Sequence, residues 1–234
     1  QAWTKPWQHF LAHQSLEPEV MYERLQALRQ RVKDDDVSYN TFGEEENQRP
    51  WALELLPFLI SSKDCEAIEA GVLQRTELLN RIMADIYGEQ QLLKEGLLPA
   101  ALVQGHPEYM PSMQGVQPAG QHFIHMAAFD IARDADGNWW VVSQRLQSPF
   151  GLGYMLENRH LVAQQFPNAF SQLHVRQLAT AYKALLSHLR QLSGAGDQAH
   201  VALLTAGASD STWFEHAYLA RHLGISLVEG NDLT

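Results

Sequence analysis

The 234-residue sequence predicts an α/β protein built from mixed helices and short strands. Three patterns lead to this prediction. Apolar residues recur at helical spacing in the first hundred residues, two strand-like segments flank an Asp-Gly-Asn turn, and a strand–helix–strand pattern occupies the C-terminal part. We therefore divide the chain into a mainly helical region (1–121), a hairpin with a Gly-containing loop and helices (122–192), and a βαβ unit (193–234).

The N-terminal region should consist of helices separated by an extended segment. Apolar side chains from Val20 to Val32 form a stripe at helical spacing, and Pro18 suits a first helical turn. Residues 51–60 form a compact apolar run, which we expect to be a buried strand or an extended segment. One helical stretch is expected within residues 1–36, and a long helix should run from a cap at Ser61 or Ser62 to Gly88. A shorter helix with Leu92 and Leu93 should end at Gly96, and Pro99 suits the start of another.

The middle of the chain predicts a β-hairpin. Its strands are expected over 122–133 and 139–145, and helices should follow over about 154–166 and 178–192. The turn Asp134-x-Asp136-x-Asn138 spaces its oxygens like the start of a calcium loop. However, such a loop needs Gly at its sixth position and Glu at its twelfth, where this sequence has Trp139 and Arg145. We therefore interpret the segment as a hairpin turn.

The C-terminal pattern predicts two parallel strands, 200–205 and 225–229, joined by a helix over 213–223. Two parallel strands alone would leave apolar faces and edges uncovered. We therefore expect the native protein to continue beyond Thr234 and this chain to be a fragment of it.

Composition excludes several classes of function. The chain carries 17 basic and 27 acidic residues, for a net charge of −10, so a nucleic-acid surface is not expected. No apolar run approaches the roughly 20 residues of a membrane span, and no secretory signal is visible. The single Cys65 cannot form an intrachain disulfide and suits a reducing compartment, so we expect a cytoplasmic protein. With Glu66 beside it, Cys65 is expected to be a structural thiol.

The segment from 138 to 159 concentrates the possible chemistry. A dense apolar strand runs into a Gly-containing loop, and the loop is followed by Glu157-Asn158-Arg159. Carboxylate and carbonyl oxygens are the ligands that magnesium prefers, so Glu157 and Asn158 are candidate metal ligands. The alternative is that Glu157 is an acid near a helix N-terminus that stabilises the helix.

Other polar groups have competing interpretations. His9 and His13 stand at helical spacing, but without a third ligand we expect a surface pair rather than a metal site. The segment 207–212 lies between a strand and a helix, where it could hold an anion, or Asp210 or Ser211 could cap the helix. Glu215 and His216 could face a ligand at the carboxyl end of the strand or lie on a solvated helix face.

Seven stretches of the sequence resemble a known family. They are Arg75–Asn80, Ala84–Gln90, Glu95–Pro99, Trp139–Val142, Gly153–Arg159, Phe214–Arg221 and Leu227–Leu233. In this order they resemble the N-terminal part of the circularly permuted type 2 ATP-grasp proteins, relatives of glutathionylspermidine synthase. The resemblance covers about residues 38–234. It implies that the hairpin belongs to an ATP-grasp sheet and that the βαβ unit is part of a Rossmann-like pre-ATP-grasp domain.

The resemblance also implies an activity. Such ligases use ATP and Mg²⁺ to convert a small-molecule or peptide carboxylate into an acyl-phosphate, which then reacts with an amine. By resemblance, Glu157 and Asn158 would hold magnesium, and Arg145 or Arg159 would contact phosphate. The loop over 148–153, with Ser148, Gly151 and Gly153, would lie near the phosphate.

Two residues depart from the family pattern. Gln144 stands where the family usually has an acid, and Phe150 stands where it has a small hydroxyl residue. In addition, the family's nucleotide-binding lysines and adenine-binding strand lie in the half that follows position 234. This stretch alone is therefore expected to bind ATP poorly and to catalyse nothing. The alternative function is a non-catalytic binding or scaffold domain that kept the fold and lost part of the metal site.

Overall fold

The computed structural model describes residues 4–12, 14–38 and 51–233 and divides the chain into two compact units. Unit 1 comprises Gln1–Ile60 and Phe150–Thr234, and unit 2 comprises Ser61–Pro149. This division differs from the three consecutive regions expected from the sequence. The difference arises because the N-terminal helix α2 packs against α6, so that residues more than a hundred positions apart share one core.

The N-terminal part of unit 1 is helical, as predicted. Helix α1 (Thr4–Ala12) precedes α2 (Pro18–Asp34), and Pro18 occupies the first turn of α2, where its missing N–H costs nothing. Residues 51–60 form no strand, so only the extended alternative holds for them. Pro57 lies within that run and has no N–H to offer to a strand partner.

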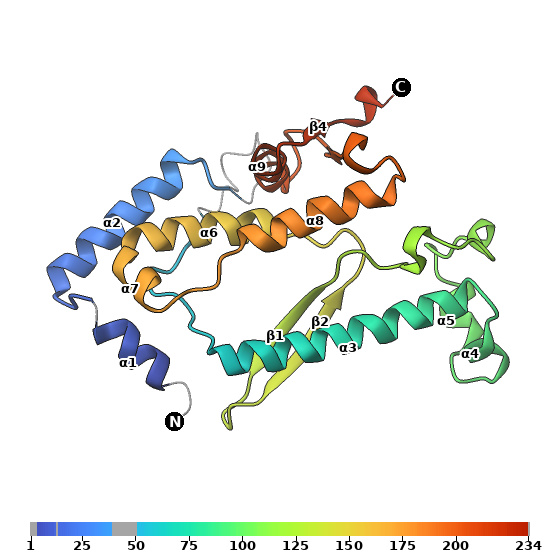
Figure 1. Cartoon of the computed structure of the whole chain (residues 1–234), viewed down its shortest axis with the longest axis horizontal. Helices are drawn as coiled ribbons and strands as arrows, with labels where there is room; N and C mark the ends of the chain where they lie inside the picture. Colours follow the sequence, from blue (N-terminus) through green and yellow to red (C-terminus); the bar gives the residue numbers. More distant parts are fainter. Residues whose placement is uncertain (1–3, 13, 39–50, 234) are drawn as a thin grey trace. The chain divides into compact units, whose positions relative to one another are not determined.

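The first helices of unit 1 after unit 2 in the sequence are α6 (Leu152–Gln165), α7 (Pro167–Gln172) and α8 (Ala179–Leu192). Sequence analysis placed the α6 helix at 154–166 and did not separate α7. Pro167 explains the break, because proline cannot continue the hydrogen-bond ladder of α6 but suits the first position of a new helix. Figure 1 shows α6 and α7 in gold and α8 in orange.

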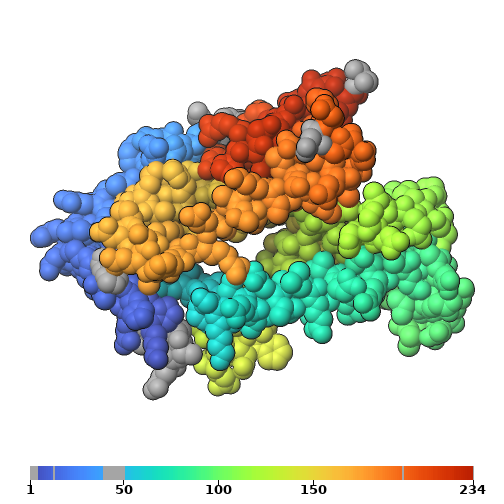
Figure 2. Space-filling model, viewed as in Figure 1, coloured from blue at the N-terminus to red at the C-terminus, as the bar shows by residue number. Residues whose placement is uncertain are grey.

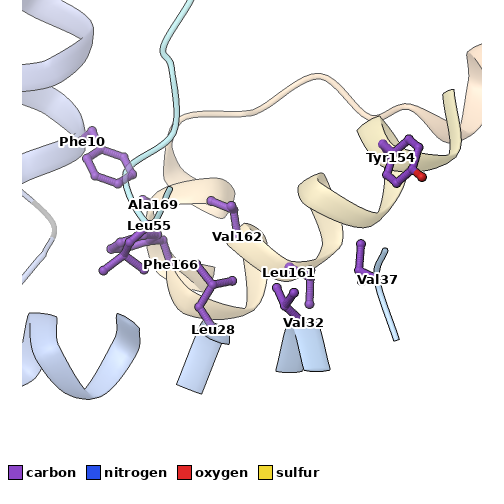
Figure 3. Close-up of a cluster of buried hydrophobic side chains, with 10 residues drawn as sticks. All are labelled: Phe10, Leu28, Val32, Val37, Leu55, Tyr154, Leu161, Val162, Phe166 and Ala169. Atoms are coloured by element: carbon purple, nitrogen blue, oxygen red, sulfur yellow. The ribbon is translucent and has the colours of Figure 1, made fainter. Parts of the chain in front are cut away.

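The core of unit 1 is built where α2 meets α6 and α7. Leu28, Leu161 and Phe166 are completely enclosed, and Phe10 packs edge-on against Phe166 with ring centroids 5.1 Å apart. Figure 3 shows these side chains converging on one another. In the space-filling view the blue N-terminal helix and the gold helices of unit 1 form a continuous surface (Figure 2). Removal of this apolar area from water is the main source of stability here.

The C-terminal part of unit 1 forms the predicted strand–helix–strand arrangement. Strands β3 (Ala202–Leu204) and β4 (Ser226–Val228) pair in parallel, with Ala202 opposite Ser226, and helix α9 (Trp213–Leu223) connects them. Gly224 ends α9 in the left-handed conformation at φ 66°, which glycine adopts without a steric penalty. Two short 3₁₀ turns, η4 (Gly196–Gln198) and η5 (Gly230–Asp232), flank the unit.

Unit 2 begins with the long helix α3 (Ser62–Ile86), which sequence analysis predicted to within two residues. Its cap is Ser61, whose Oγ accepts a hydrogen bond from the Asp64 N–H at 3.1 Å. The short helices α4 (Gln91–Lys94) and α5 (Ala100–Gln104) follow at the predicted places, and the 3₁₀ turns η2 (Pro111–Met113) and η3 (Ala119–Gln121) lead to the hairpin.

The hairpin pairs β1 (Ala128–Arg133) with β2 (Trp139–Arg145) in antiparallel register, with an irregularity between Asp130 and Ile131. Strand β1 starts six residues later than predicted. The preceding backbone is engaged elsewhere, because the N–H groups of Phe123 and Ile124 both donate to Oδ1 of Asn80 on α3. Asn80 thereby takes up donors that a longer strand would have needed.

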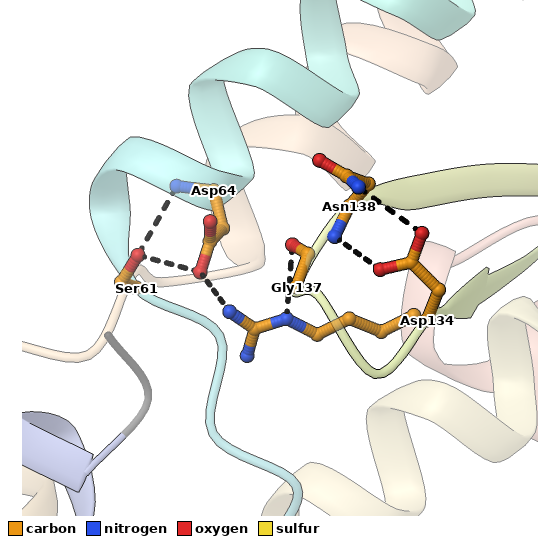
Figure 4. Close-up of polar contacts among 6 residues, drawn as sticks. Ser61, Asp64, Asp134, Gly137 and Asn138 are labelled. Atoms are coloured by element: carbon orange, nitrogen blue, oxygen red, sulfur yellow. Dashed lines mark hydrogen bonds and ion pairs between the residues drawn. The ribbon is translucent and has the colours of Figure 1, made fainter. Parts of the chain in front are cut away.

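The hairpin turn confirms the interpretation of residues 134–138 (Figure 4). The Asp134 carboxylate accepts the Asn138 N–H at 2.7 Å, the Asn138 side-chain amide at 3.1 Å and Trp140 Nε1 at 2.8 Å. The Trp140 and Asn138 hydrogen bonds lower the pKa of Asp134 to about 2. The carboxylate is thus used by the turn itself, as expected for hairpin chemistry.

None of the described helices is long and apolar enough to cross a lipid bilayer.

Candidate functional site

The predicted site residues divide between the two units. Arg145 and Ser148 belong to unit 2, whereas Gly151, Gly153, Glu157, Asn158 and Arg159 belong to unit 1. We describe each group within its own unit.

Arg145 lies at the end of β2 and is bound by a carboxylate on the neighbouring strand. Its two terminal nitrogens donate to the two oxygens of Asp130 at 2.9 and 3.0 Å, a bidentate arrangement, and the Ser143 hydroxyl donates to the same carboxylate. The Ser143 bond and then Arg145 lower the pKa of Asp130. The side chain of Arg145 remains 42% exposed, so one edge of the guanidinium is fixed while the group still meets solvent.

Gln144 bonds to a different residue of unit 2. Arg75 of α3 donates to its side-chain oxygen at 3.4 Å, a long and weak contact. The position that usually carries an acid in the resembled family therefore holds a neutral acceptor next to a cation. Ser148, beyond the end of β2, adopts a left-handed backbone conformation at φ 42°.

The start of α6 is organised around a buried carboxylate. Gly151 and Gly153 both donate their backbone N–H to Oε1 of Glu215 on α9, at 2.6 and 3.0 Å. Glu215 is 1% exposed, and its second oxygen, Oε2, is buried and has no hydrogen-bond partner among the described residues. The amides that the sequence predicted to lie near a phosphate thus already hold an anionic group from the chain itself.

The shape of this contact explains both glycines. Gly151 lies at φ 116°, a conformation that side chains rarely adopt. At Gly153 an added Cβ would lie 2.8 Å from Cγ of Glu215 and 3.1 Å from its backbone oxygen. Residue 151 is therefore a glycine because of its backbone conformation, and residue 153 is a glycine because α6 and α9 approach closely there.

Sequence analysis missed this role of Glu215. Of the two interpretations it offered, the solvated helix face is wrong, since the side chain is enclosed. Because the partner glycines lie more than sixty residues earlier, local spacing carries no signal for the contact. The neighbouring His216 is half-buried, and its Nδ1 lies 3.1 Å from the hydroxyl of buried Thr205.

Glu157 also faces the interior of unit 1. It is 3% exposed on α6, and Tyr218 of α9 forms a side-chain hydrogen bond with it. Burial and then this bond raise the pKa of the Tyr218 hydroxyl above its usual range. The Glu157 carboxylate therefore accepts a hydrogen bond from a tyrosine hydroxyl that is protonated at neutral pH.

The two residues that follow Glu157 contact other neighbours. Oδ1 of Asn158 accepts a hydrogen bond from Nε1 of Trp51 at 3.0 Å. Arg159 donates to the backbone oxygen of Arg176 at 3.2 Å and lies over the Phe170 ring, 5.7 Å from its centroid. Burial lowers the pKa of the Arg159 guanidinium. Consecutive helical residues diverge by roughly 100°, which accounts for the three directions.

These contacts bear on the predicted magnesium ion. Both candidate metal ligands accept hydrogen bonds within the fold, Glu157 from Tyr218 and Asn158 from Trp51. Their side chains thus contact different neighbours and do not converge on one point. As described, this donor set does not fit one shared ion. The metal role of Glu157 and Asn158 stays a prediction.

The remaining metal candidates give no site within the described residues. No group of three or more His, Cys, Asp or Glu side chains is arranged to hold a metal ion there. The pair of His9 and His13 cannot be assessed, because His13 lies outside the described residues.

The loop before α9 is closed by local hydrogen bonds. Asp210 accepts the Thr212 N–H at 2.8 Å and also the Thr212 hydroxyl, and these bonds lower the pKa of Asp210. The residue in the cap position is Thr212 itself, so neither Asp210 nor Ser211 is the helix cap. The loop lacks the glycine patterns of nucleotide-binding turns.

Comparison with known proteins decides the family. The family model for circularly permuted ATP-grasp type 2 proteins matches residues 57–234, which is most of the chain. The chain belongs to this family. ATP-grasp proteins generally bind ATP together with Mg²⁺. The mixture of helices with a small antiparallel sheet is consistent with an ATP-grasp-like α/β fold.

Several uncharacterized bacterial proteins are similar to the chain. One from Mycobacterium leprae is 36% identical over 212 residues, which cover 90% of this chain and 37% of that protein. One from Mycobacterium tuberculosis is 37% identical over 90% of this chain and 38% of its own length. One from Synechocystis is 29% identical over 93% of this chain and 46% of its own length. The chain therefore spans less than half the length of these relatives.

Proposed function

We propose that the chain is part of an ATP-dependent ligase that joins a carboxylate to an amine through an acyl-phosphate, as glutathionylspermidine synthase-like enzymes do. The observation that carries this proposal is the family match over residues 57–234. The substrates would be small molecules or peptides, and ATP and Mg²⁺ would be required. Since the chain spans under half of its relatives, the proposal concerns the longer protein.

Within this proposal Arg145 has the clearest role. Phosphoryl transfer is catalysed mainly by positioning and by neutralising charge on the phosphate oxygens. A guanidinium that Asp130 holds by one edge and that remains 42% exposed is preorganised for such a contact. Ser148, which follows on the same chain segment, would lie near the same phosphate.

The unit 1 residues have a supporting role in the same proposal. Gly151 and Gly153 would shape the loop near the phosphate, with Glu215 holding their amides. Arg159 would contact phosphate only if it left Arg176 and Phe170. ATP would arrive as its magnesium complex, but Glu157 and Asn158 as described do not fit one ion, so we derive no step through the metal.

One observation favours the alternative, a non-catalytic binding or scaffold domain. Gln144 stands in place of an acid and contacts Arg75, and the oxygens of Glu157 and Asn158 bond within the fold. A domain that had lost catalysis would keep these internal bonds, since they serve the fold rather than a ligand.

Release of ADP from the longer protein, measured with Mg-ATP, tests the proposal. Arg145→Gln should lower turnover at least tenfold, because it removes a charge from the developing phosphate contact. Arg81→Gln is the matched control, since Arg81 of α3 is also an exposed arginine that pairs with a carboxylate, Glu77. It should leave turnover unchanged.

Two results would contradict parts of the proposal. If the intact protein neither binds Mg-ATP nor releases ADP, the ligase function fails and the binding-domain alternative gains support. If Glu157→Gln leaves the magnesium dependence of ADP release unchanged, Glu157 is not a metal ligand.

A further inference from the structure

A cavity of about 260 Å³ lies beside α8 and η4 in unit 1. Its lining residues include none of the predicted site residues between 145 and 159. Its lining consists of four polar side chains, one apolar side chain and a glycine: Lys183, Ser187, Arg190, Gln191, Leu186 and Gly196. The volume lies just below the range of roughly 300–1,000 Å³ that is usual for small-molecule sites. The cavity therefore suits a ligand of few atoms.

The lining is cationic and rich in hydrogen-bond donors. Lys183, Ser187 and Arg190 follow one another at intervals of four and three residues, which places them on one face of α8. None of the described side chains that line the cavity is acidic, although the chain as a whole carries a net charge of −10. Among the described ion pairs, none involves Lys183 or Arg190.

Arg190 supplies a second, independent observation. Its Nε atom is enclosed by the protein, and none of the described residues accepts a hydrogen bond from it. A buried donor on a charged group is costly when it is left unpaired, and such groups in native proteins usually meet an ion or water. An oxyanion in the cavity would offset the charge of this guanidinium through its terminal nitrogens, which can bind carboxylate or phosphate oxygens in pairs, because Nε itself is enclosed and out of a ligand's reach.

We propose that this cavity, which we call the α8 pocket, binds a small oxyanion. Arg190 would bind it through a two-nitrogen contact, and Lys183 would balance its charge. The Ser187 hydroxyl and the Gln191 amide would offer further hydrogen bonds. The shared chemistry is a compact group with two or more anionic oxygens, which either a phosphate or a dicarboxylate provides.

Calorimetric titration of the chain with inorganic phosphate and, separately, with succinate tests this site. Both titrations need low ionic strength, because salt screens exposed charges. One of the two anions should bind saturably at one site. Arg190→Gln should weaken that binding at least about tenfold, and Lys183→Gln should weaken it severalfold. The anion that binds more tightly identifies whether the source is a phosphoryl or a carboxylate ligand.

The matched control is Arg29→Gln, which removes a charge from an exposed arginine of α2 outside the pocket. It should leave the affinity unchanged. The proposal is overturned if neither anion saturates, if sodium chloride produces the same heat, or if Arg190→Gln and Arg29→Gln have equal effects. If Arg190→Gln fails to fold by circular dichroism, Lys183→Gln decides, and an unchanged affinity in that variant overturns the site. None of these outcomes depends on ATP turnover.

Discussion

Glu215 shows how a single buried residue can determine the shape of a predicted binding loop. A carboxylate in the first turn of a helix is usually expected to face solvent and to stabilise its own helix. Here it accepts hydrogen bonds from two amides at the start of another helix instead, while no described residue bonds to its second oxygen. The conformation of the 148–153 loop therefore depends on Glu215, which holds the amides of Gly151 and Gly153.

At the same scale, Glu157 and Tyr218 should depend on each other energetically. Tyr218→Phe removes the donor of their hydrogen bond, and Glu157→Gln replaces the charged acceptor with a weaker neutral one, so each should destabilise unit 1 by about 1–3 kcal/mol. If the bond is the main role of Glu157, the double variant should cost less than the sum of the two single changes. Urea unfolding of all four proteins measures this coupling.

The control for this double-mutant experiment combines Glu157→Gln with Tyr22→Phe, because Tyr22 is an exposed tyrosine of α2. These two changes should simply add. Additive behaviour of Glu157 with Tyr218 as well would show that the hydrogen bond contributes little and would leave Glu157 available for another role.

Residues with local partners were the predictable ones. Ser61 caps α3 through a contact three residues away, and Asp134 binds groups within six residues, so sequence spacing alone identified both. By contrast, the contacts of Glu215 with Gly153 and of Trp51 with Asn158 join residues 62 and 107 positions apart. No spacing rule reports such pairs, because they depend on how the helices pack.

At the scale of elements, the close approach of α6 and α9 depends on the absence of a side chain at one position. Gly153→Ala should destabilise the contact by about 1–3 kcal/mol, because the new Cβ would lie 2.8 Å from Glu215 Cγ and close to its backbone. Hydrogen exchange of the α6 amides should become faster.

Gly71→Ala is the matched control for that change. Gly71 lies inside α3 with no atom within 4 Å of an added Cβ, so alanine should stabilise α3 by roughly 0.5–1 kcal/mol. If both substitutions slow exchange in their own helices, the steric explanation for Gly153 is wrong.

Helices were predicted better than strands and extended segments. The stripes and caps of α2 and α3 are properties of their own sequence, and their bounds agreed closely. Strand β1 began late because Asn80 binds the backbone before it, and residues 51–60 formed no strand because they pack as an extended segment with Leu55 in the core of unit 1. Those outcomes depend on neighbours that sequence periodicity does not show.

At the scale of the molecule, the family and the order of elements could be predicted, but the site could be predicted only in part. The segment of predicted site residues spans both units, with Arg145 in one and Glu157 in the other. Sequence spacing placed these residues near one another along the chain. It could not show that Glu157, Asn158 and Arg159 each contact a different neighbour, since that depends on the rotation of α6 against α9 and α2.

Unit 1 should lose stability in alkaline solution. Burial, and secondarily the charge of Glu215, raises the pKa of Tyr182 to about 12 from its usual value of 10.0. The folded protein therefore keeps a proton that the unfolded chain loses. This contribution to stability is complete below pH 10 and is lost as the pH rises towards 12.

Thermal unfolding between pH 9 and pH 11.5 checks this dependence. Tyr182→Phe lacks the titrating group, so its melting temperature should fall less over that interval than that of the unsubstituted chain. At pH 8 it should be less stable, because the Tyr182 hydroxyl no longer donates to the backbone oxygen of Leu152. Equal slopes for the two proteins would contradict the assignment to Tyr182.

The division of unit 1 into two separated stretches of chain has a consequence for synthesis on the ribosome. Leu28 and Leu161 meet in the core, yet they stand 133 positions apart in the chain. At roughly 5–20 residues per second, the N-terminal helices must wait on the order of ten seconds for their partners to emerge. During that interval unit 2, which is continuous in sequence, can fold first, while the apolar face of α2 lacks the helices that cover it in the folded protein.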